Sequence, residues 1–137
     1  MIVLDTHVLI WALSNSPRLG AKAQARIDEE RRGQRVRISA ATLWEIALLV
    51  SKRRLELTTN VRDWIDTALA WPGVELWPID AAIAVDSVLL PGDVHNDPAD
   101  RFLIATARHR SATLVTADTK ILSYSKDGHV RALNATQ

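Results

Sequence analysis

Short apolar runs alternate with helical patterns along the whole chain, and this alternation limits the folds open to it. The runs that predict strands are Ile2–Leu4, Val36–Ile38, Val74–Trp77, Thr113–Thr116 and Val130–Leu133. The patterns that predict helices lie between them, at His7–Leu13, Pro17–Arg32, Thr42–Lys52, Val61–Trp71, Ala81–Leu89 and Pro98–Arg110. Alternating strands and helices favour an α/β fold in which helices cover both faces of a parallel sheet. Strands as apolar as Ile2–Leu4 fit burial from both sides.

The length and composition indicate one domain without a membrane segment. At 137 residues the chain can bury a sizeable core, and we expect a single domain over residues 1–137. It has no cysteine, which excludes disulfides and thiolate metal sites. No apolar run approaches the roughly 20 residues that span a bilayer, and no basic segment precedes an apolar stretch at the N-terminus. We therefore expect a cytoplasmic protein with no membrane partner.

Acidic side chains recur beside the predicted strands and helices. Asp5 and Asp118 follow two of the strands, Glu45 lies near the start of a helix, and Asp97 and Asp100 open another. In open parallel sheets, ligands bind beyond the carboxyl ends of the strands, so we expect these carboxylates to converge there. They would repel one another strongly unless cations were bound. An all-oxygen set of this kind suits Mg²⁺ or Mn²⁺.

Local roles can also explain each of these positions. Asp97 precedes Pro98 and suits a helix N-cap, and Asp5 and Asp118 are placed to cap the segments that follow them. Glu45 would be the third residue of a capping box that begins at Thr42. Independent caps at one sheet edge are a less economical explanation than a shared site. His7 and His95 lie nearby without zinc-binding spacing and are not assigned as ligands, while Trp11 and Trp44 are expected in the core.

The charge balance permits a polyanionic partner. Setting aside the five clustered carboxylates reduces the 16 acidic residues to 11, against 17 lysines and arginines. The rest of the surface is then basic, with arginines concentrated at Arg31, Arg35 and Arg37. Such a surface suits a phosphate backbone, although solvated helix ends explain the same charges.

Four segments together resemble one known family. They are Val3-Leu4-Asp5-Thr6-His7, the stretch from Ser39 to Ala47 around Glu45, the stretch from His95 to Ala107 around Asp97 and Asp100, and Leu114-Val115-Thr116-Ala117-Asp118. In this order and spacing they resemble the PIN-domain ribonucleases, most closely the VapC-type toxins of bacterial toxin–antitoxin pairs. The resemblance covers nearly the whole chain. It implies a PIN-like three-layer fold whose central parallel sheet has about five strands in the order 3-2-1-4-5.

The resemblance also implies a chemistry and a set of site residues. It points to a Mg²⁺- or Mn²⁺-dependent endoribonuclease in which Asp5, Glu45, Asp100 and Asp118 hold metal and carry catalysis. Asp97, Thr116 and Thr6 would support this site. Divalent cations make hydroxide available near neutral pH, and nearby cations stabilise the charge that develops on the phosphate. The candidates for RNA-backbone contact are Arg101, Arg31, Arg35 and Arg37.

The resemblance further implies partners, and other classes of function stay open. We expect an unpaired loop of tRNA or rRNA as substrate, a cognate antitoxin, and a homodimer. A PIN-like RNA-processing nuclease that is not a toxin and a non-catalytic RNA-binding domain are the alternatives. A receiver-type phosphoryl regulator would need a phosphorylatable aspartate after a central strand. Asp80, after Val74–Trp77, is its one candidate.

Overall fold

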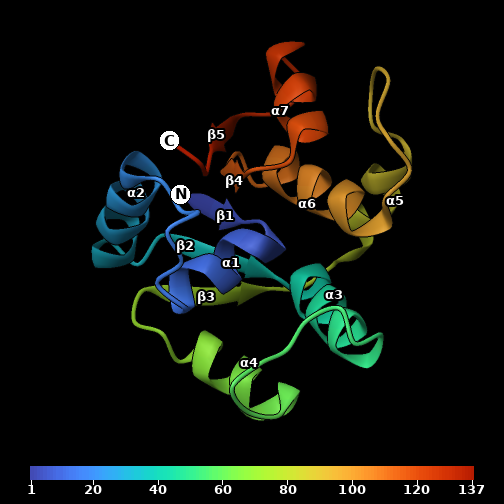
Figure 1. The fold of residues 1–137 in the computed structure, drawn as a ribbon. Coiled ribbons are helices and arrows are strands. Elements are labelled where there is room, and N and C mark those ends of the chain that lie inside the picture. Colours follow the sequence, from blue (N-terminus) through green and yellow to red (C-terminus); the bar gives the residue numbers. More distant parts are fainter.

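A computed structural model describes all 137 residues, and its centre is a five-stranded parallel sheet (Figure 1). The strands are β1 (Ile2–Leu4), β2 (Val36–Ser39), β3 (Val74–Trp77), β4 (Thr113–Thr116) and β5 (Ala132–Asn134). Their order in the sheet is β3-β2-β1-β4-β5, and every neighbouring pair is parallel. The central strand β1 places Ile2 opposite Val36 on one side and Thr113 on the other. The predicted PIN-like α/β fold and strand order are confirmed.

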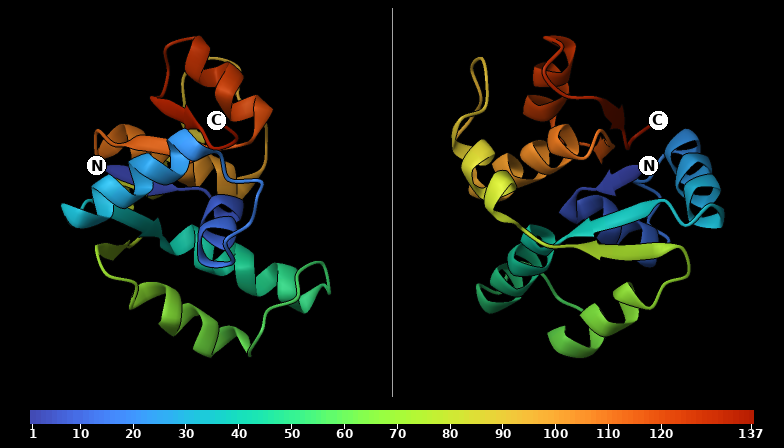
Figure 2. Two further views of the ribbon diagram at one scale, coloured as in Figure 1. Left: turned by 60° about the vertical axis from the view of Figure 1, so that its left-hand side comes forward. Right: turned by 180° about the vertical axis from the view of Figure 1, so that it is seen from behind.

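Helices cover both faces of the sheet and give the molecule three layers. They are α1 (Thr6–Leu13), α2 (Ala21–Arg32), α3 (Ala40–Ser51), α4 (Val61–Leu69), α5 (Ala81–Val88), α6 (Pro98–His109) and α7 (Thr119–Lys126). Figure 2 shows α4 near the β3 edge of the sheet and α7 near the β5 edge. None of these helices combines the length and the apolar character that crossing a membrane requires.

Alternate residues of β1 enter two separate cores, as the period of a strand requires. Ile2 and Leu4 are fully buried in the core formed with α1, α2, α3 and α4, which also contains Ile27 and Ile46. Val3 points to the opposite face and packs in the core formed with α6 and α7. Burial on both faces explains why this strand has no polar residue before Asp5.

Four predicted element starts differ from the structure because tertiary contacts or caps set them. Helix α1 begins at Thr6 rather than His7, because Asp5 accepts from Thr6 N–H. Residues 17–19 form a turn, and α2 begins only at Ala21, where Gly20 N–H donates to the Ala135 carbonyl and Lys22 N–H to that of Gln137. Helix α3 begins at Ala40, directly after β2, because the Ser39 hydroxyl accepts from Ala41 N–H. Strand β5 starts at Ala132, and the buried Val130 precedes it. The segment after Asp118, for which the sequence pattern predicts no helix, forms α7.

Three strands lead into a helix within two residues, and in each case the residue directly before the helix caps it. Asp5 follows β1 and caps α1, Ser39 is the last residue of β2 and caps α3, and Asp118, two residues after β4, caps α7. Because parallel strands end at the same edge, these junctions lie together. This edge of the sheet therefore carries Asp5 and Asp118 next to each other, as the sequence predicts.

Candidate active site

Asp5 is the most buried carboxylate of the site, with 6% of its surface exposed. One carboxylate oxygen accepts from the backbone N–H of Thr6 at 2.6 Å, which caps α1. The other accepts from the Thr116 hydroxyl at 2.5 Å. Burial raises the pKa of Asp5, and the hydrogen bonds from Thr116 and Thr6 oppose that rise. Thr116 and Thr6 thus support Asp5 directly, Thr6 through its backbone.

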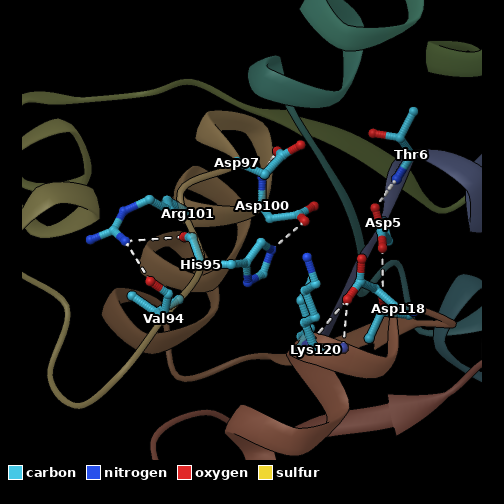
Figure 3. A network of polar contacts seen from close by, with 11 residues as sticks. Asp5, Thr6, Val94, His95, Asp97, Asp100, Arg101, Asp118 and Lys120 are labelled. Atoms are coloured by element: carbon cyan, nitrogen blue, oxygen red, sulfur yellow. Dashed lines mark hydrogen bonds and ion pairs between the residues drawn. The ribbon is translucent and has the colours of Figure 1, made fainter.

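Asp118 is tied to the same threonine. Its backbone N–H donates to the Thr116 hydroxyl at 3.0 Å, so this hydroxyl links β1 to the turn after β4. Asp118 Oδ1 caps α7 by accepting from the N–H groups of Lys120 and Ile121 (Figure 3). Capping occupies Oδ1 and leaves Oδ2 available to a ligand.

Asp97 and Asp100 open α6. Asp97 Oδ1 accepts from Asp100 N–H at 3.0 Å, and Pro98 occupies the first turn, so the predicted N-cap is present. The Asp100 carboxylate lies 2.7 Å from the His95 ring nitrogen. Burial raises the pKa of Asp100 to about 7, with His95 opposing the rise and the charges of Asp5, Asp97 and Asp118 adding to it. The ionised form of Asp100 is therefore destabilised in this pocket by burial and by the neighbouring carboxylates.

Glu45 approaches the same place from α3. Burial raises its pKa, and the charges of Asp5 and Asp97 raise it further. The capping-box explanation for Glu45 is wrong, because Ser39 caps this helix and Thr42 is fully buried with its hydroxyl 3.4 Å from that of Thr6. No local helix contact accounts for the position of Glu45.

All five predicted acidic side chains line one cavity of about 310 Å³. Its walls are Asp5, His7, Trp11, Glu45, Asp97, Asp100, Ala117 and Asp118. Three of the four predicted metal ligands have raised pKa values, and burial is the largest cause for each of them. The caps use only one oxygen each of Asp97 and Asp118. A set of converging carboxylate oxygens fits Mg²⁺ or Mn²⁺.

The structure adds residues that the sequence pattern did not identify. A ring nitrogen of His95 and one oxygen each of Asp100 and Asp118 lie within 4.8 Å of one another. Trp11, expected in the core, is partly exposed and lines the carboxylate cavity, and Trp44 is 52% exposed. A cavity of about 380 Å³ beside His95 is also lined by Lys120. In the sequence, His95 is marked only by its place at the start of the segment that contains Asp97 and Asp100.

The structure does not bring Arg31, Arg35 and Arg37 to the carboxylates. They lie at the end of α2 and the start of β2, at the opposite edge of the sheet from Asp5. Each has a partner there: Arg31 donates to the Pro72 carbonyl, Arg35 pairs with Glu30, and Arg37 pairs with Glu75. Any contact that these arginines make with RNA would lie away from the acidic cavity.

Arg101, a predicted RNA-backbone contact, instead binds backbone carbonyls of the protein itself. Its guanidinium donates to four carbonyls, those of Ser87, Val88, Val94 and His95. Figure 3 shows the contacts with Val94 and His95. The four carbonyls belong to the end of α5 and to the loop before α6. Arg101 thus holds the loop that carries His95, and its donors are occupied within the chain.

Asp80 does not occupy the position that a receiver domain requires. It follows β3, which is an edge strand, whereas the phosphorylated aspartate of that class would end a central strand. Its side chain caps α5 through Ile83 N–H and pairs with Arg110 at 3.2 Å. The receiver alternative is therefore wrong.

The fold and the acidic cavity define a PIN domain. The PIN domain family model matches residues 2–127, and the chain belongs to this family. It is 29% identical to ribonuclease VapC22 of Mycobacterium tuberculosis over 123 residues, covering 90% of this chain and 91% of that protein. The resemblance to the VapC-type PIN-domain proteins that the sequence motifs indicated is confirmed.

Solved structures share the fold at lower identity. VapBC2 from Rickettsia felis, solved with a DNA fragment from its promoter, is 18% identical with a TM-score of 0.71, covering 98% of both chains. VapBC-5 from Mycobacterium tuberculosis, a member of the VapBC family of toxin–antitoxin systems, is 21% identical with a TM-score of 0.60, covering 96% of both chains. At these identities the likeness concerns the fold.

Proposed function

We propose that this PIN domain is a Mg²⁺- or Mn²⁺-dependent endoribonuclease that acts as the toxin of a toxin–antitoxin pair. The observation that carries the proposal is the convergence of five carboxylates in one cavity, three of them with pKa values raised by burial. Similarity to ribonuclease VapC22 along nine-tenths of the chain supports RNA as the substrate.

Asp5, Glu45, Asp100 and Asp118 would hold the metal, and Asp97 would support them. A bound Mg²⁺ or Mn²⁺ would supply hydroxide near neutral pH and positive charge for the phosphate. Thr116 and Thr6 N–H orient the Asp5 carboxylate, so that it enters the reaction without reorganising. The capping bonds orient Asp97 and Asp118 in the same way.

Lys120 is the cation best placed to meet the RNA backbone at the cavity. Figure 3 shows its side chain extending from the start of α7 toward the carboxylates, and it forms no ion pair with the protein. Trp11 in the cavity wall and the exposed Trp44 offer faces on which unpaired bases can stack. Both features favour an unpaired RNA segment, such as a tRNA or rRNA loop.

The proposed partners are a cognate antitoxin and a second copy of the chain. An arginine or lysine from the antitoxin would pair with the cavity carboxylates and keep metal out. The exposed Val85, Val88 and Leu89 at the end of α5 are a candidate surface for the homodimer. Since RNA substrate and antitoxin are both made in the cytoplasm, that is the proposed location.

Incubation of the purified protein with unstructured RNA tests the enzymatic part of the proposal. We expect cleavage with Mg²⁺ or Mn²⁺, none with EDTA, and none from Asp5→Asn under either condition. RNA binding without cleavage would instead support a non-catalytic RNA-binding domain. Metal-dependent cleavage by a protein that is harmless to the cell would support an RNA-processing nuclease.

A further inference from the structure

His95 lies where the loop between α5 and α6 meets the acidic cavity. The ring makes its one hydrogen bond to Asp100, at 2.7 Å, and 17% of the side chain is exposed. The sequence offered no zinc-type spacing that would make this histidine a ligand. Its position beside two carboxylates is a product of the fold (Figure 3).

The distances suit a single coordination sphere. The His95 nitrogen and one oxygen each of Asp100 and Asp118 all lie within 4.8 Å of one another. Ligand atoms on opposite sides of an ion with bonds of about 2.1 Å are about 4.2 Å apart. Because no pair of these atoms is more than 4.8 Å apart, their separations exceed the span of a single coordination sphere by about half an ångström at most.

The backbone behind the ring is held in place. The Arg101 guanidinium donates to the carbonyls of Val94 and His95 at 3.2 and 3.1 Å, and also to the end of α5. Asp100 is in turn fixed by the first turn of α6, where its N–H donates to Asp97. The ring and the carboxylate are thus presented to each other by two anchored segments, a requirement for a precise ligand set.

We infer that His95 supplies a nitrogen ligand to the divalent metal that Asp100 and Asp118 hold, and that the site therefore prefers Mn²⁺ to Mg²⁺. This inference rests on the proposed metal-dependent function. Imidazole nitrogen suits transition metals, whereas Mg²⁺ favours oxygen ligands and retains several waters. A site of carboxylates alone would discriminate less between the two ions. The competing role for His95 is that of a hydrogen-bond donor that orients Asp100 without touching the metal.

Electron spin echo modulation of the Mn²⁺-loaded protein distinguishes these two roles, because it detects nitrogen bound directly to Mn²⁺. We expect nitrogen modulation in the wild type, a change of its frequencies when histidine is labelled with ¹⁵N, and its loss in His95→Gln. The matched control is His7→Gln, since His7 lines the acidic cavity with Asp100 and Asp118 but lies outside the three-atom group, and it should keep the modulation.

Binding titrations give the second measurement. In His95→Gln the Mn²⁺ affinity should fall by roughly tenfold or more, while the Mg²⁺ affinity changes less. The ratio of Mn²⁺ to Mg²⁺ affinity should therefore decrease. Circular dichroism and melting temperature establish that the variant is folded. The ¹⁵N-labelled wild type provides a test that needs no substitution.

Two negative outcomes have different meanings. Mn²⁺ that binds tightly to the wild type without nitrogen modulation, or with modulation that persists in His95→Gln, would overturn the role of His95 and leave the metal-dependent nuclease intact. A wild type that binds no divalent metal and cleaves no RNA would remove the proposed function itself, and the ligand role of His95 with it.

Discussion

At the scale of single residues, the Thr116 hydroxyl links Asp5 to Asp118. Thr116 donates to Asp5 and accepts from Asp118 N–H, and it is fully buried. Thr116→Val keeps the shape but leaves the Asp5 carboxylate and the Asp118 N–H without this partner. We expect a loss of about 1–3 kcal/mol in the free energy of unfolding, measured by urea denaturation. Thr116→Ser retains the hydroxyl and is the control; equal losses in both variants would contradict the hydrogen-bond argument.

The individual carboxylates should differ in their effect on RNA cleavage. Asp5→Asn, Asp100→Asn and Asp118→Asn should each abolish cleavage while the protein stays folded, because asparagine keeps the volume and removes the charge that binds metal. Asp97→Asn should reduce activity less, since asparagine still caps α6. Cleavage rates at saturating Mn²⁺ measure this order. If Asp97→Asn abolished cleavage while Asp100→Asn remained active, Asp97 rather than Asp100 would be the metal ligand.

At the scale of elements, the loop between α5 and α6 depends on Arg101. Both Arg101→Ala and Arg101→Lys lose the planar set of donors that reaches four carbonyls. We expect faster amide hydrogen exchange across residues 89–97 in both variants, with reduced cleavage. The lysine variant retains the charge, so it separates this structural role from a phosphate contact. If lysine restored slow exchange and full cleavage, charge rather than the carbonyl contacts would be the function of Arg101.

At the scale of the whole molecule, stability should depend on pH and metal together. The pKa of Asp100 is raised from 3.8 to about 7, so the folded protein binds a proton more tightly than the unfolded chain does. This stabilising contribution is complete below pH 3.8 and is lost as the pH rises to about 7. The melting temperature of the metal-free protein should therefore fall over this range.

Metal should reverse that loss of stability. Mn²⁺ or Mg²⁺ binds ionised carboxylates, so millimolar metal should raise the melting temperature more at pH 8 than at pH 5. Asp100→Asn should flatten both the pH dependence and the metal response. Thermal scans that do not change with millimolar metal would speak against a shared site.

Growth of bacteria that express the protein tests the toxin role. The wild type should slow growth, and Asp5→Asn, which lacks a central carboxylate, should not. Co-expression of the neighbouring reading frame should restore growth if it encodes the antitoxin. Equal arrest by the wild type and Asp5→Asn would show that toxicity does not depend on the carboxylate site.

The sequence by itself determined the sheet and the acidic cavity. Strands such as Val74–Trp77 and Thr113–Thr116 were predictable to the residue, because their apolar runs are bounded by turn residues and caps. The carboxylates were predictable as a group, because residues that follow parallel strands meet at one edge whatever the details of packing. The resemblance to known motifs supplied the strand order.

Only the tertiary structure decided which further residues reach the site. Arg31, Arg35 and Arg37 lie at the end of α2 and the start of β2, whereas the carboxylates gather where the parallel strands end, so these arginines do not reach the cavity. His95 lies in a loop that is held by Arg101 of α6, and Lys120 lies at a helix start that is tied to Thr116 of β4 through Asp118. Local sequence sets where an element begins and which face is apolar. The placement of a loop side chain is set by distant partners such as Arg101, and a pattern of nearby residues contains no information on them.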